Sequence, residues 1–210
     1  AQLGITPFLK VEKPTPLDEA INLIWYLENI FYPAAGSIYN YIESNIYEGK
    51  EVHNEFVSLG FWPGGDRDGN PFVNTEITLK VAQKLRQSVL KNYYRDMRML
   101  RRRLTFKKVV NIVLELEGKL YQSFINPDKI VLTYEEFMDG LLKIKDLLIN
   151  EYQSLYLTEL KDLIHKAKIF GFYFATLDIR QDSRIHHQVF QHITKKLLKE
   201  GSTVFPKNYN

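Results

Sequence analysis

One stretch of the chain limits what it can fold into more than any other. From Glu76 to about Leu104 it contains neither proline nor glycine. Apolar residues recur within it at three- and four-residue steps, namely Ile77, Val81, Leu85, Val89 and Tyr93. That spacing places them on one face of a helix. The sequence therefore predicts a single long helix here.

Helix start signals predict further helices on both sides of this one. Thr15, Pro16 and Asp18 combine a hydroxyl cap, a first-turn proline and an early carboxylate. Thr133 and Glu136 have the spacing of a capping box. Helices are predicted over residues 16–31, 107–124, 133–153, 158–170 and 183–199, with another between Pro33 and Tyr47 that stops at Gly49.

Two short apolar runs interrupt this helical pattern. Phe56 to Trp62 and Phe172 to Ile179 read as buried strands, the second following a helix that ends at Gly171. Thr75 is the expected cap of the long helix. The pattern predicts a mainly helical chain in which each of two distant strands opens into a loop rich in charged residues.

Composition excludes several classes of protein. The 210 residues are 45% hydrophobic with a net charge of +3, which predicts one packed domain, residues 1–210, and gives little reason to expect a polyanionic partner. The absence of cysteine excludes disulfide frameworks and thiolate metal sites. No apolar run approaches the roughly 18 residues of a membrane span, and no secretory signal is visible. We expect a cytoplasmic protein and, without an initiator Met, an excised or processed chain.

The loop from Gly64 to Pro71 is the most unusual segment, since it combines three glycines with Asp66, Arg67 and Asp68. Its acids have the spacing of a calcium loop, but Pro71 occupies the required glycine. A lysine is also missing at the position that a phosphate-binding loop requires. Two interpretations stay open: an ion-paired structural turn that fixes Arg67 between carboxylates, and a functional loop.

Arg180 follows the second apolar run. A guanidinium at the carboxyl end of a strand suits a phosphate or carboxylate, because its fork donates two parallel hydrogen bonds. The structural alternative is an ion pair of Arg180 with Asp178 or Asp182.

Two further groups of residues were weighed as sites. A basic cluster at the end of the long helix could bind nucleic acid, although a solvated helix face is the commoner meaning. It consists of Arg95, Arg98, Arg101, Arg102, Arg103, Lys107 and Lys108. Four histidines late in the chain lack the carboxylate-rich pattern of a zinc helix, which favours core or surface roles. They are His165, His186, His187 and His192.

Two segments together closely resemble signature segments of the phosphoenolpyruvate carboxylase family. They are Gly60 to Pro71, which reads GFWPGGDRDGNP, and Phe170 to Ser183, which reads FGFYFATLDIRQDS and is followed by His186. Residues 13–20, KPTPLDEA, resemble the helix start that precedes the first segment in that family. Phe61, Pro63 and the pair Asn74-Thr75 depart from the more frequent residues of the family.

The resemblance implies a fold, a reaction and roles for residues. Family members are cytoplasmic, usually tetrameric lyases with a helix-rich (β/α)8 barrel, which combine phosphoenolpyruvate with bicarbonate using magnesium or manganese and release oxaloacetate and phosphate. Arg180 would hold the phosphate of phosphoenolpyruvate, and Asp66, Arg67 and Asp68 would form an active-site loop, with Arg67 the first choice for catalysis.

Other parts of the family pattern are missing from the sequence. These are the segment with the catalytic histidine, the carboxylates that bind the metal, and a mobile loop rich in glycine and arginine. The resemblance therefore implies an internal fragment of the barrel that is inactive alone, needs the remainder of the parent polypeptide, and self-associates through open strand edges. Two alternatives stay open: a basic-helix module that binds nucleic acid, and a helical scaffold without a ligand.

Overall fold

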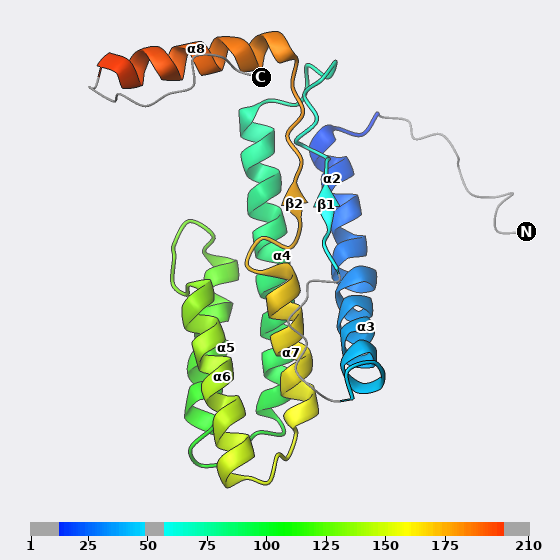
Figure 1. Ribbon diagram of the computed structural model, residues 1–210, viewed down its shortest axis with the longest axis vertical. Helices are drawn as coiled ribbons and strands as arrows, with labels where there is room; N and C mark the ends of the chain where they lie inside the picture. The colour runs from blue at the N-terminus through cyan, green and yellow to red at the C-terminus, as the bar shows by residue number, and fades with distance from the viewer. Residues whose placement is uncertain (1–12, 49–56, 200–210) are drawn as a thin grey trace, which may run out of the picture.

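The computed structural model describes residues 13–48 and 57–199. Figure 1 shows upright helices side by side, with a small sheet against their upper half and one helix projecting sideways from the top. In chain order the elements are α2 (Pro16–Tyr26), η1 (Leu27–Phe31), α3 (Tyr32–Asn45), β1 (Gly60–Phe61), α4 (Thr75–Arg101), α5 (Val110–Ile125), α6 (Tyr134–Glu151), α7 (Leu157–Phe170), β2 (Thr176–Leu177) and α8 (Ser183–Lys199).

Helix α4 is the predicted long helix, and it forms the centre of the core. Its buried residues include Val81, Leu85, Val89 and Tyr93, each no more than 1% exposed. They pack against α2 and α5 and against the upper part of α7. The helix begins at Thr75, one residue earlier than predicted, because its cap is Asn74, whose side chain accepts the hydrogen bond from the Ile77 N–H at 2.9 Å. Asn caps helices better than Thr, which explains why the prediction of Thr75 was wrong.

Pro33 does not separate two helices as the sequence predicted. Helices α2 and α3 run into one another through η1, a π-helical turn that ends just before Tyr32. Proline inside a regular helix clashes with the carbonyl four residues earlier. The wider π-helical turn relieves that clash, so the chain passes Pro33 without a break. The α3 helix then ends at Asn45, while the predicted stop at Gly49 lies outside the described residues.

The later helix predictions are confirmed closely. Thr133 and Glu136 form the predicted capping box at the start of α6, and Gly171 ends α7 with a positive φ of 52°. α8 spans Ser183–Lys199, the predicted range. None of the helices in the described ranges combines the length and apolar composition needed to cross a membrane.

The strands are much shorter than predicted. β1 and β2 have two residues each and pair in parallel, with Gly60 opposite Thr176 and Phe61 opposite Leu177. The aromatic run after Gly171 mostly forms turns instead of strand: the N–H of Phe174 bonds to the Phe170 carbonyl at 3.0 Å. Phe174 is buried, but Thr176 is exposed, so β2 is not the buried strand that was expected. Aromatic packing against the helices outcompetes extension of the strand.

Candidate anion-binding site

The carboxyl ends of β1 and β2 bring the two unusual sequence segments together. Past the strands, the Asp178 N–H donates to the Phe61 carbonyl at 2.9 Å and the Arg180 N–H to the Gly65 carbonyl at 3.1 Å. The Arg67 N–H donates in turn to the Arg180 carbonyl at 2.9 Å. The pairing thus continues beyond the strands and makes Asp66 and Arg180 partners in a parallel bridge. Residues 114 positions apart become neighbours where α/β proteins bind ligands.

Glycines make this close pairing possible. A Cβ atom on Gly65 would lie 2.1 Å from the backbone oxygen of Asp178, so any side chain there would push the two segments apart. Gly64 has a φ of 78°, and a Cβ on it would lie 2.6 Å from Cγ2 of Val81 in α4. The loop is therefore packed tightly between α4 on one side and the segment after β2 on the other.

Asp66 orients the guanidinium of Arg180. Nη1 of Arg180 lies 3.3 Å from Oδ2 of Asp66, while Oδ1 of Asp66 accepts from the Asp68 N–H at 3.3 Å. The Arg180 side chain is 64% exposed, and Asp66 is the one hydrogen-bond partner of its guanidinium within residues 13–48 and 57–199. The group therefore keeps N–H donors that are accessible to solvent. This arrangement can bind an oxyanion.

The alternative pairing of Arg180 with Asp178 or Asp182 is not found. Asp182 instead pairs with Arg184, whose Nη2 lies 2.6 Å from Oδ2 of Asp182. Hydrogen bonds from the Arg184 side chain and backbone lower the pKa of Asp182 to about 2. Asp182 is therefore charged and already paired with Arg184. The ion-pair partner of Arg180 is Asp66.

Arg67 is not held between carboxylates, contrary to one interpretation of the sequence. Side chains alternate along an extended segment, so Asp66 faces Arg180 and Arg67 turns to the other side. There Nη2 of Arg67 donates to Oγ1 of Thr78 in α4 at 2.9 Å. No carboxylate in the described ranges forms an ion pair with Arg67, and its Nε is buried without an acceptor there. The roles of Asp66, Arg67 and Asp68 toward a ligand stay predictions.

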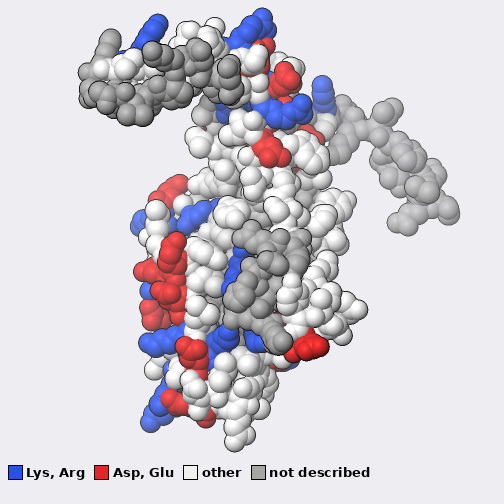
Figure 2. Space-filling view, in the orientation of Figure 1, with Lys and Arg blue, Asp and Glu red and all other residues white. Residues whose placement is uncertain are grey.

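Four of the seven residues of the basic cluster near the end of α4 form ion pairs with carboxylates in the described ranges. Arg98 and Arg101 pair with Glu117, Arg103 pairs with Glu159, and Lys108 with Glu151. On the face in Figure 2, basic and acidic side chains alternate along the edge where α5 and α6 lie. This geometry favours the reading of a solvated, ion-paired face over a nucleic-acid site.

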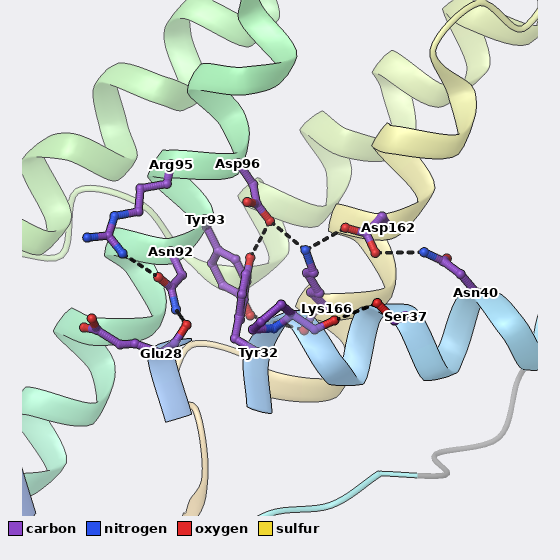
Figure 3. Close-up of polar contacts among 11 residues, drawn as sticks. Glu28, Tyr32, Ser37, Asn40, Asn92, Tyr93, Arg95, Asp96, Asp162 and Lys166 are labelled. Atoms are coloured by element: carbon purple, nitrogen blue, oxygen red, sulfur yellow. Dashed lines mark hydrogen bonds and ion pairs between the residues drawn. The ribbon is translucent and has the colours of Figure 1, made fainter. Parts of the chain in front are cut away.

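A buried polar network that the sequence analysis did not identify ties α3, α4 and α7 together (Figure 3). The Tyr32 hydroxyl donates to Oδ2 of Asp96 at 2.8 Å, and Nζ of Lys166 lies 3.1 Å from the same oxygen. Lys166 also pairs with Asp162 at 2.6 Å, and Asp162 accepts from Asn40. Burial lowers the pKa of Lys166, but the two carboxylates outweigh it, so the net shift is upward. Only the i,i+4 spacing of Asp162 and Lys166 was readable from the sequence.

The same network extends to His165, which is buried at 3% exposure. Its Nδ1 lies 3.1 Å from Oδ1 of Asn40 and its Nε2 lies 3.3 Å from Oε2 of Glu43. Burial lowers the pKa of His165, while the charge of Glu43 acts in the opposite direction. This histidine has a core role, as the sequence favoured. No three His, Asp or Glu side chains within the described ranges are placed to hold a metal ion.

Two cavities formed by the described residues lie away from Arg180. One of about 740 Å³ opens between α2 and α4 and is lined in part by Trp25, Lys84 and Phe124. Another of about 360 Å³, lined in part by Asp96 and Asp162, lies beside the buried network. The side chain of Arg180 is instead on the surface, with 64% of its area exposed.

Comparison with known proteins gives a consistent result. The family model for phosphoenolpyruvate carboxylase matches residues 2–124 and 114–203. Curated relatives named phosphoenolpyruvate carboxylase are 27% identical in Shewanella loihica and 29% identical in Aliivibrio salmonicida, each match covering 94% of this chain. A third, from Aeromonas salmonicida, is 25% identical over 90% of the chain. The chain spans about a quarter of the length of these relatives, 25% to 26%.

Proposed function

The chain belongs to the phosphoenolpyruvate carboxylase family, and we propose from this that it forms one side of the active site of such a carboxylase. The whole enzyme would join phosphoenolpyruvate to bicarbonate and release oxaloacetate and phosphate. The observation that carries the proposal is the guanidinium of Arg180, which Asp66 orients at the carboxyl ends of two parallel strands.

Arg180 has the properties that a phosphate ligand requires. Its side chain is 64% exposed, and its one side-chain hydrogen bond to a described residue leaves several donors available. Two parallel N–H···O bonds to a phosphoryl group are the strongest arrangement that an arginine can offer. Asp66 orients the guanidinium of Arg180 without burying it. The backbone N–H of Asp68 donates a hydrogen bond to the Asp66 carboxylate and so helps to hold it in place. As negative charge develops on the phosphoryl oxygens, a fixed guanidinium stabilises it.

The short parallel pair fits a part of a larger barrel. β1 and β2 each have one strand neighbour in the described ranges, and a parallel pair of two residues per strand is far from closing a barrel. We place residues 1–210 as one segment of a helix-rich (β/α)8 barrel whose remaining strands come from the rest of the parent polypeptide. The parent is proposed to be a cytoplasmic homotetramer.

Magnesium or manganese belongs to the proposal only for the parent enzyme. The described residues do not fit a metal, because no group of three potential ligands converges there. We place the metal ligands and the catalytic histidine outside this chain, and assign no step to them here. The chain alone is therefore proposed to bind anions weakly and to make no oxaloacetate.

The experiment is a titration of the 210-residue chain with phosphoenolpyruvate, followed by NMR of backbone amides. The Arg180 amide and its neighbours should shift in the wild type and should not shift in Arg180→Gln. Arg184→Gln is the matched control, because it removes a nearby exposed guanidinium that pairs with Asp182. Equal shifts in the wild type and Arg180→Gln would refute the role of Arg180. Oxaloacetate formation by the chain alone, in a coupled assay, would refute its proposed inactivity.

A further inference from the structure

Thr78 is a buried threonine of α4 that holds two points of the preceding loop with one hydroxyl group. Its side chain is 7% exposed. Oγ1 accepts from Nη2 of Arg67 at 2.9 Å, and its one proton faces two carbonyl oxygens, that of Gly64 at 2.7 Å and, within the helix, that of Asn74 at 3.0 Å. The hydroxyl therefore connects Gly64, at the start of the glycine-rich loop, to the side chain of Arg67 in the middle of the loop.

We propose that Thr78 is a positioning residue for the anion site, acting on Asp66 and Arg180 through Arg67. The inference rests on the proposed function, because the anion that Arg180 would hold is phosphoenolpyruvate. Thr78 does not touch that anion in this scheme. It fixes the loop that carries Asp66, and Asp66 fixes the guanidinium of Arg180.

Arg67 is the link between α4 and the segment after β2. Its backbone N–H donates to the Arg180 carbonyl at 2.9 Å, and its side chain reaches α4 on the opposite side of the loop. The bond to Thr78 is the one side-chain hydrogen bond that Arg67 makes in the described part of the chain. Without it a charged, half-buried group has no partner to keep it against the helix, and it would turn to water.

The requirement is for the hydroxyl group and not for the shape of the residue. Valine and threonine are both branched at Cβ, so a methyl group in place of the hydroxyl keeps the shape of the side chain. It would nevertheless leave the Gly64 carbonyl and the Arg67 guanidinium without their partner. Unpaired buried polar groups of this kind shift equilibria by about tenfold or more. The loop should then open more often and carry Asp66 away from Arg180.

The test compares Thr78→Val with Thr78→Ser in the full 210-residue chain. Valine keeps the shape and removes the hydroxyl, while serine keeps the hydroxyl. Thr75→Val is the matched control, because Thr75 is exposed in the first turn of the same helix. The first measurement is hydrogen exchange of the Arg67 and Arg180 amides, and the second is NMR titration with phosphoenolpyruvate at a temperature where every variant is folded.

Thr78→Val should lower the protection of both amides about tenfold and weaken phosphoenolpyruvate binding by a similar factor. Thr78→Ser and Thr75→Val should behave like the wild type. Unchanged protection in Thr78→Val would overturn the inference. The inference would also be overturned if Thr78→Val loses amide protection but keeps its affinity for phosphoenolpyruvate, because Thr78 would then be only a structural residue.

The two proposals can fail separately. If Arg180→Gln loses phosphoenolpyruvate binding and Thr78→Val retains it, the proposed function stands and the positioning role falls. If the wild-type chain shows no response to phosphoenolpyruvate, the proposed function falls. The exchange measurement then decides by itself whether Thr78 holds the loop in place against Arg180.

Discussion

Gly65→Ala is the substitution that most directly tests how the anion site is built. The new Cβ would lie 2.1 Å from the backbone oxygen of Asp178 and 3.0 Å from its carbonyl carbon. Neither atom can rotate away as a flexible side chain would, so the loop and the segment after β2 must separate. Two backbone hydrogen bonds join them at this point, from Arg180 to Gly65 and from Arg67 to Arg180.

The expected cost follows from these contacts. Forcing an extra methyl group into a packed site costs about 1–3 kcal/mol, and each lost hydrogen bond adds about 1 kcal/mol. Relaxation of the loop reduces the sum, so we expect a loss of about 3 kcal/mol in the free energy of unfolding. For a chain of this length, that lowers the melting temperature by about 6–12 °C.

The assay is thermal unfolding by circular dichroism, combined with hydrogen exchange at the Arg180 amide. Gly118→Ala is the control: it lies on the exposed side of α5, and a Cβ there meets nothing within 4 Å. The free energy of unfolding of that variant should rise by about 0.5–1 kcal/mol, because alanine is more favourable than glycine in a helix interior. If Gly65→Ala is as stable as the wild type and protects the Arg180 amide equally well, the close approach does not exist.

Three further predictions concern the helices and the buried network. Tyr32→Phe removes the hydroxyl that donates to Asp96. It should lower the free energy of unfolding, measured with urea, by about 2 kcal/mol. A decrease below about 0.5 kcal/mol would contradict the role of the network. Since burial lowers the pKa of His165 below 6.5, the unfolded chain takes up the proton first as the pH falls. The free energy of unfolding should therefore decrease as the pH falls through about 6.5, less so in His165→Gln; an NMR pKa above 6.5 would show the opposite sign. Thr133→Ala should cost about 1 kcal/mol because it removes a cap, whereas Thr75→Ala should cost little; equal melting temperatures for the two variants would refute this.

Local signals in the sequence predicted most of the features that depend on neighbouring residues. The spacing of apolar residues gave the long helix α4, the pair Thr133 and Glu136 gave the start of α6, and Gly171 marked the end of α7. Helix hydrogen bonds and caps form within a few residues of one another, so the determinants lie side by side in the chain. The prediction failed at Pro33, where a π-helical turn absorbed a residue that ordinarily breaks a helix.

The sequence also determined which residues are candidates for chemistry, since a guanidinium after an apolar run and a glycine-rich acidic loop are visible without coordinates. It left the partners of each charge undecided. The sequence suggested Asp178 or Asp182 as an ion-pair partner for Arg180, whereas the tertiary structure pairs it with Asp66 through the register of two parallel strands. The tertiary structure also brings the Arg67 side chain against α4, where it donates a hydrogen bond to Thr78. Such pairings depend on which segments meet across more than a hundred residues, and electrostatic attraction between side chains is too weak to specify that meeting; packing of the helices and strands decides it.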